Sequence, residues 1–199
     1  MTIKKHDNDI MWKQFLIDGS DKSFSTIYSY YADKLYSYGI SLGFDSEICK
    51  DAIQDVFMKI YSSRTIIDNI SNPASFLFQS FKNRLIDIAR KNKNEFDIDI
   101  SHIPFTVDVT ILDDIIDKER SEILKTKVRD ILDNLSDTQR EAVYLRYIAE
   151  MDYSEISDRL NIKQESARKL IYRAIKSLRE QNFEELSEVT LIVIMLLLV

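Results

Sequence analysis

Glycine and proline are nearly absent from this chain, which has three glycines and two prolines among its 199 residues. These two residue types interrupt regular structure most often, so long uninterrupted segments remain. Within those segments apolar residues recur every three or four positions, which is the spacing of one face of an α-helix. The sequence therefore predicts an all-α protein with two small helical domains joined by an acidic linker, the second containing a helix-turn-helix.

Charge divides the chain into regions. The net charge is −6, but residues 94–122 hold nine acids and two bases, whereas residues 82–93 and 163–179 are strongly basic. Because local charge governs contact with phosphates, the acidic total does not argue against binding of nucleic acid. We assign residues 1–93 to a first domain, 94–119 to the acidic linker, 120–182 to a second domain and 183–199 to an apolar tail.

The first domain is predicted to contain helices over residues 9–17, 22–42, 46–61 and 73–91. The second of these helices carries an aromatic and aliphatic stripe, which is interpreted as core, with a stacking platform for bases as the alternative. The stripe consists of Phe24, Ile27, Tyr28, Tyr31, Leu35, Tyr38 and Leu42. Gly43 is expected to end this helix, and Asn72 followed by Pro73 to begin the last one. Phe76 and Phe81 of the last helix are predicted to pack in the core.

A helix is expected over about residues 117–134. A capping box at Ser136 and Gln139 follows it, and a weaker start signal of the same type at Asp152 and Glu155 leads into a helix-turn-helix over residues 153–179. Asn161 falls at the turn, where a left-handed backbone suits asparagine better than most residues. Apolar residues at helical spacing form one face of the second helix of this motif: Ala167, Leu170, Ile171, Ala174, Ile175 and Leu178.

The opposite face of that second helix is basic. One acid, Glu165, stands against six cations: Lys163, Arg168, Lys169, Arg173, Lys176 and Arg179. A helix of this kind suits the major groove of DNA and its phosphates. The alternative is an ordinary solvated face of a helical bundle.

Other features exclude several classes of protein. The single cysteine, Cys49, cannot form an intramolecular disulfide and suits a reducing, cytoplasmic location. With two histidines and no glycine-rich phosphate loop, we expect no enzyme, no catalytic residues, no cofactor and no metal site. The N-terminus lacks the apolar segment of a secretory signal. The apolar run 189–199 is too short to cross a bilayer, so no stable membrane insertion is expected.

Three motifs occur in a fixed order along the chain. Residues 50–60 contain Asp51, Gln54, Asp55 and Phe57 in an acidic-x-x-Gln-acidic-x-Phe pattern. Residues 72–91 contain Asn83, Asp87 and Arg90 in an Asn-x-x-x-Asp-x-x-Arg pattern, and residues 135–179 hold the helix-turn-helix. Together these motifs resemble the sigma-70 family of bacterial RNA polymerase sigma factors, specifically the extracytoplasmic-function (ECF) group, over about residues 20–93 and 120–181.

The resemblance implies a transcription initiation factor that binds core RNA polymerase and helps to melt the minus-ten region of promoter DNA. It places core-polymerase binding at Asp51, Gln54 and Asp55. It places minus-ten DNA binding at Lys82, Asn83, Arg84, Arg90 and Lys91. Asp87 has an alternative, structural role as an ion-pair partner of Arg84, Arg90 or Lys91. The resemblance places minus-thirty-five DNA binding at six residues of the helix-turn-helix: Lys163, Arg168, Lys169, Tyr172, Arg173 and Lys176.

The sequence departs from the family at several positions. Glu150 and Met151 stand where the family usually has a glycine, Lys163 stands where a serine commonly caps the second helix, and Leu170 replaces a frequent arginine. The resemblance also implies an anti-sigma partner. The acidic linker is interpreted either as a mimic of nucleic-acid charge or as a spacer. The apolar tail is interpreted as an added packing helix, a latch between the domains or a handle for the anti-sigma factor.

Two rival functions are also consistent with parts of the sequence. A helix-turn-helix regulator acting without core polymerase would bind duplex DNA alone and would have no need of the motifs in that range. A structural helical adaptor would make the separate basic clusters accidental.

Overall fold

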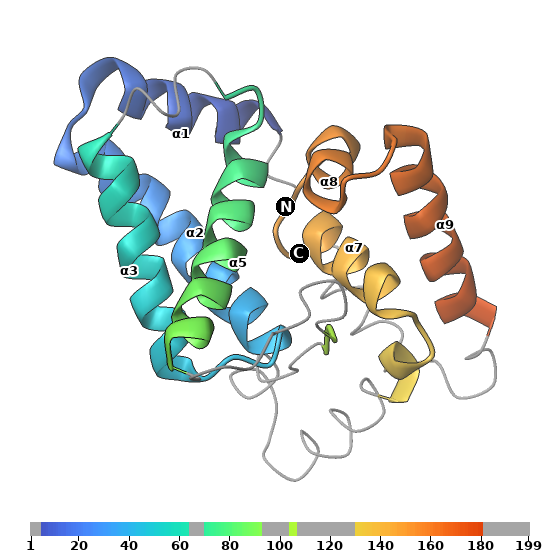
Figure 1. Ribbon diagram of the computed structural model, residues 1–199. Coiled ribbons are helices and arrows are strands. Elements are labelled where there is room, and N and C mark those ends of the chain that lie inside the picture. The colour runs from blue at the N-terminus through green and yellow to red at the C-terminus, as the bar shows by residue number, and fades with distance from the viewer. Residues whose placement is uncertain (1–4, 64–69, 93–103, 107–129, 181–199) are drawn as a thin grey trace, which may run out of the picture. The chain divides into compact units, whose positions relative to one another are not determined.

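The computed structural model describes residues 5–63, 70–92, 104–106 and 130–180 of the chain (Figure 1). All regular secondary structure in these ranges is helical, which confirms the predicted all-α class. The chain divides into two compact units, an N-terminal unit, Ile3–Pro104, and a C-terminal unit, Phe105–Val199. None of the described helices is both long enough and apolar enough to span a membrane.

The N-terminal unit contains the helices α1 (Lys5–Asp18), α2 (Asp21–Ser41), α3 (Ser46–Ser62) and α5 (Pro73–Asn92). Helix α3 packs against both α2 and α5, and α1 packs against α2 (Figure 1). The predicted helix 9–17 is thus the C-terminal part of a longer one, and the other three predictions agree with the structure to within one residue at each end.

Polar caps and a glycine fix the turns beside α2. The Ser20 hydroxyl accepts a hydrogen bond from the Ser23 N–H, which caps the start of the helix. The Asp18 carboxylate accepts hydrogen bonds from the Ser20 N–H, the Ser23 hydroxyl and the Gln14 amide, and these hold the pKa of Asp18 well below its usual range. At the other end Gly43 adopts a left-handed conformation with φ of 81°, which confirms the predicted stop.

The core of the N-terminal unit is largely aromatic. Tyr31 and Tyr38 of the predicted stripe are buried, but Tyr28 is 43% exposed, so the prediction that it is core is wrong. Its ring lies over the edge of the core, against the buried Phe57 ring. In α5 the prediction holds for Phe81 but not for Phe76, which is only half-buried; Phe78 is fully buried instead, edge-on to Tyr38.

Gly39 allows α2 to approach α3 and α5 closely. A Cβ atom at this position would lie 2.5 Å from the Cys49 Sγ and 3.0 Å from the Phe81 ring. The Cys49 thiol is buried there, and burial, aided by the negative charge of Asp45, raises its pKa to about 11. Cys49 is therefore a packing residue whose thiol stays protonated near neutral pH.

Changing Gly39 to Ala should destabilise the N-terminal unit by about 1–3 kcal/mol, although alanine favours a helix by about 1 kcal/mol over glycine. The overlap with buried atoms outweighs the propensity gain. Trp12, the sole tryptophan, is buried in this unit, so thermal unfolding followed by its fluorescence measures the change. An unchanged or raised melting temperature would show that Cys49 and Phe81 can move aside.

The C-terminal unit contains α7 (Asp137–Tyr147), α8 (Tyr153–Leu160) and α9 (Gln164–Glu180). Capping boxes begin α7, at Ser136 and Gln139, and α8, at Asp152 and Glu155, which confirms both predicted start signals. Asn161 ends α8 with φ 53° and ψ 48°, which confirms the predicted left-handed turn. Helices α8 and α9 therefore form a helix-turn-helix against α7.

The turn between α7 and α8 compensates for the missing glycine. Glu150 takes the left-handed conformation with φ of 59°. The Met151 N–H donates to the Leu145 carbonyl at 2.9 Å, and the Arg146 guanidinium donates to the Met151 carbonyl at 2.8 Å. Glycine would adopt this left-handed conformation without steric cost. Here the fully buried Met151 side chain and these two hydrogen bonds hold the turn in place instead.

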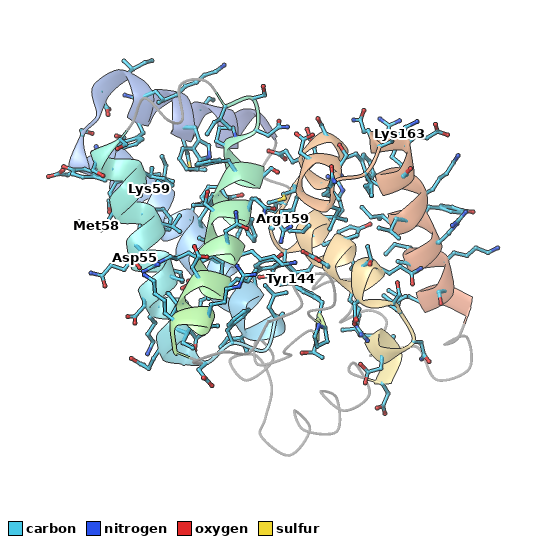
Figure 2. All side chains as sticks on the ribbon, in the orientation of Figure 1. Asp55, Met58, Lys59, Tyr144, Arg159 and Lys163 are labelled. Atoms are coloured by element: carbon cyan, nitrogen blue, oxygen red, sulfur yellow. The ribbon has the colours of Figure 1, made fainter. Side chains whose placement is uncertain are left out.

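A buried ion pair joins α7 to α8. The Arg159 guanidinium lies 3.0 Å from the Glu141 carboxylate, and these side chains are only 4% and 12% exposed. Arg159 and Tyr144 are labelled in Figure 2. Phe105, which falls inside the predicted linker, is also buried, with its ring edge-on to Tyr144 at 5.6 Å. Neither contact is predicted by the local sequence pattern.

Most of the predicted linker, the helix expected over residues 117–134 and the apolar tail lie outside the described residues. Only residues 104–106 of the linker and residues 130–134 of that helix are described. The side chain of Arg179 also lies outside them.

Candidate protein and nucleic-acid interfaces

The outward face of α3 carries the residues predicted to bind core polymerase. Asp51, Gln54 and Asp55 are all exposed, because Ala52, Ile53 and the other apolar positions of α3 turn toward α2 and α5. Met58, one turn further on, is 61% exposed and adds an apolar side chain to this face (Figure 2). We refer to Asp51, Gln54, Asp55 and Met58 as the α3 face. The helical spacing of Met58 from Gln54 could have identified it.

The residues predicted to bind minus-ten DNA lie along α5 in different environments. Asn83, Arg90 and Lys91 are exposed, whereas Lys82 and Arg84 are half-buried. The Asn83 side-chain oxygen accepts a hydrogen bond from the Gln79 amide at 2.9 Å. This contact lies within α5 and leaves the Asn83 amide group on the helix surface.

An ion pair links the α3 face to α5. Both Nε and Nη2 of Arg84 contact one oxygen of Asp55, with Nε at 2.7 Å. The prediction that Asp87 pairs with Arg84, Arg90 or Lys91 is wrong for the described side chains, because none of those cations pairs with it. Asp55 on the neighbouring helix offers Arg84 a partner across the helix interface. The two side chains are 48% and 33% exposed, so the pair contributes little stability.

Two surface hollows flank this ion pair between α3 and α5. The larger has a volume of about 560 Å³, and Phe76, Ser80, Asn83 and Asp87 of α5 line one side of it. The smaller, of about 330 Å³, is lined by Asp51, Gln54, Asp55, Arg84, Ile88 and Lys91. The structure thus brings residues predicted for polymerase binding and residues predicted for DNA binding to the same groove, while Lys82 and Arg90 line neither hollow.

The residues predicted to bind minus-thirty-five DNA form one side of α9, opposite its buried side. Ala167, Ile171 and Ala174 are buried, as predicted. The predicted DNA-binding residues are all exposed: Lys163, Arg168, Lys169, Tyr172, Arg173 and Lys176. Lys163 immediately precedes the helix (Figure 2), and Tyr172, at 68% exposed, projects from its middle. We refer to these six residues as the α9 face.

Two cations of the α9 face have neighbours that hold them differently. Lys169 pairs with Glu165 one turn earlier at 2.7 Å, and both side chains are well exposed. The Arg168 guanidinium lies 5.3 Å from the centre of the Tyr153 ring at the start of α8. Glu165 is the single acid in the first turn of α9, so the α9 face remains positively charged.

Comparisons with known proteins match both units. Residues 27–95 match the family described as Sigma-70 region 2, and residues 125–178 match Sigma-70, region 4. The chain is 29% identical to the ECF RNA polymerase sigma factor SigM of Bacillus subtilis (strain 168), over 77% of this chain and 91% of SigM. It is 25% identical to SigW, an ECF RNA polymerase sigma factor of the same organism, over 82% of this chain and 90% of SigW.

A solved structure shares the fold. CnrH, determined in complex with the cytosolic domain of CnrY, superposes with a TM-score of 0.53 at 18% identity, covering 88% of this chain and 97% of CnrH. The two family regions contain α3 and α5 in one unit and α7, α8 and most of α9 in the other, in the order that the motifs predicted. The chain is therefore a sigma-70 family transcription initiation factor of the ECF group, which directs RNA polymerase to promoters.

Proposed function

We propose that the two units divide promoter recognition between them, with the α3 face binding core RNA polymerase. The supporting observation is the exposure of Asp51, Gln54 and Asp55 on one side of a helix whose other side is buried. An exposed acidic face beside one apolar side chain, Met58, suits a basic partner surface. Charge complementarity would speed association, and the apolar side chain would add area removed from water.

The α5 residues Asn83, Arg84, Arg90 and Lys91, with Lys82, are proposed to hold the non-template strand of the minus-ten element. Single-strand capture requires cations for phosphates and a hollow for an unstacked base. The 560 Å³ hollow falls within the size range of small-ligand pockets, and it combines the half-buried Phe76 ring with the polar group of Asn83. The bond between Arg84 and Asp55 would have to compete with a phosphate at this site.

The α9 face is proposed to bind the minus-thirty-five element in the major groove. Its cations would contact phosphates or guanine, and an arginine bound to guanine contributes about 1–3 kcal/mol of discrimination. The regulator that acts without polymerase is not favoured, because the N-terminal unit matches Sigma-70 region 2.

A protein that works with core polymerase and DNA would reside in the cytoplasm, and this is the location that we propose. We also propose an anti-sigma factor as a further partner. CnrH, which shares this fold, was determined with the cytosolic domain of another protein bound. A comparable partner of this chain would compete with polymerase if it covered the α3 face.

Reconstituted transcription tests the proposed function. We expect the purified chain to co-elute with core RNA polymerase on gel filtration and to give transcripts from promoters selected by the assembled holoenzyme. Arg173→Ala should reduce promoter binding while leaving co-elution intact, because α9 would act on DNA alone. Specific binding of duplex DNA without any association with core would instead support the regulator.

A further inference from the structure

Tyr153 brings together two arginines from different helices. Its ring centre lies 5.0 Å from the guanidinium of Arg146 on α7 and 5.3 Å from that of Arg168 on α9. Both distances are within the range of a cation–π interaction. One half-buried aromatic ring on α8 therefore contacts a cation of α7 and a cation of α9.

The position of the Tyr153 ring is fixed by its surroundings. Tyr153 is the first residue of α8, directly after Asp152, whose carboxylate accepts a hydrogen bond from the Glu155 N–H at 2.8 Å. Arg146, on one side, is held by its 2.8 Å bond to the Met151 carbonyl. The ring is thus attached to a capped helix end and a hydrogen-bonded turn, whereas Arg168 is exposed.

A ring restrains an arginine differently from an acid. Lys169, paired with Glu165, would have to release that carboxylate before donating to a phosphate. Among the described residues Arg168 has no ion pair, and an arginine stacked on a ring keeps its N–H groups available as donors. Restraint by the ring also lowers the side-chain entropy that would otherwise be lost when the guanidinium binds DNA.

We propose that Tyr153 is a positioning residue for promoter recognition, which acts by holding the Arg168 guanidinium ready for the minus-thirty-five duplex. This proposal rests on the proposed role of the α9 face. Tyr153, which lies on the first helix of the helix-turn-helix, would thus increase the affinity for DNA without contacting a base itself. Arg146 takes part by holding the ring from the α7 side.

The test is a mutant cycle in the full chain assembled with core RNA polymerase. The probe is a promoter duplex selected from a randomised pool by the wild-type holoenzyme. Tyr153→Leu should weaken binding about two- to fivefold, whereas Tyr153→Phe, which keeps the ring, should stay within about twofold of wild type. In an Arg168→Ala background Tyr153→Leu should have no further effect, because the residue that it positions is absent.

Each other outcome overturns a different statement. Equal losses for Tyr153→Phe and Tyr153→Leu would show that the hydroxyl acts rather than the ring. A loss from Tyr153→Leu that persists undiminished in the Arg168→Ala background would show a purely structural role, which thermal unfolding of the same variants would detect. If Arg168→Ala itself leaves the affinity unchanged, the proposed role of Arg168 in DNA binding fails, and the inference fails with it.

Discussion

Replacing Glu141 with Gln should strongly destabilise the C-terminal unit, with a loss of about 3–5 kcal/mol in its free energy of unfolding. The substitution keeps the shape of the side chain but removes the charge that faces Arg159, whose side chain is only 4% exposed. Loss of this carboxylate leaves the positive charge of Arg159 less compensated, and burial prevents its guanidinium from recovering its hydration. Since small domains have only about 5–15 kcal/mol of stability in total, this change removes a large part of it.

Glu165→Gln is the matched control for this prediction. It makes the same chemical change in the ion pair between Glu165 and Lys169. The side chains of Lys169 and Glu165 are 64% and 77% exposed. It should therefore cost no more than about 0.5 kcal/mol. Thermal unfolding followed by far-ultraviolet circular dichroism should show part of the transition moving to lower temperature in Glu141→Gln alone. Trp12 fluorescence, which reports the N-terminal unit, should not change.

A double substitution separates charge from packing. Glu141→Leu combined with Arg159→Met removes both charges and keeps apolar volume, so it should recover most of the stability that Glu141→Gln loses. Similar losses from Glu141→Gln and Glu165→Gln would contradict the importance of the buried pair. Failure of the double variant to recover would instead indicate that the shape of the two side chains matters more than their charge.

Regular helices were predictable because their signals are local. The starts of α5 at Pro73 and α7 after Ser136, and the left-handed turn at Asn161, depend on residues within a few positions of each other. Pairing across helices was not predictable in the same way. Glu141 and Arg159 each look like a surface residue in the helical pattern, and only the packing of α7 on α8 buries them together.

The candidate sites show the same division between local and tertiary signals. Helical spacing predicted which face of α9 would be exposed, and family motifs selected residues on α3 and α5. The pairing of Arg84 with Asp55, rather than with Asp87 on its own helix, depends on how α3 packs against α5. The contact of Tyr153 with Arg168 likewise joins positions fifteen residues apart in the sequence, through a turn whose geometry is set by Asn161.

Reversing one charge on the α3 face should weaken binding of core RNA polymerase by about 10–100-fold. Asp51→Lys is the variant of choice because Asp51 is exposed and, among the described residues, has no ion pair. If the polymerase surface is basic, a lysine at position 51 is repelled by it. Repulsion between like charges reduces the binding free energy by several kcal/mol at most, and by less at the exposed rim of an interface. Affinity can be measured by titrating fluorescently labelled chain with core polymerase.

Asp33→Lys is the control, since Asp33 is an exposed acid on α2, outside the α3 face, and the change in net charge is identical. Its effect should be within about twofold of wild type, and the difference between the two variants should shrink as salt rises, because exposed charges are screened. Equal losses in both variants would show that core polymerase responds to the overall charge of the chain. A large loss for Asp51→Lys that salt does not reduce would instead indicate that the lysine clashes sterically in a closely packed contact.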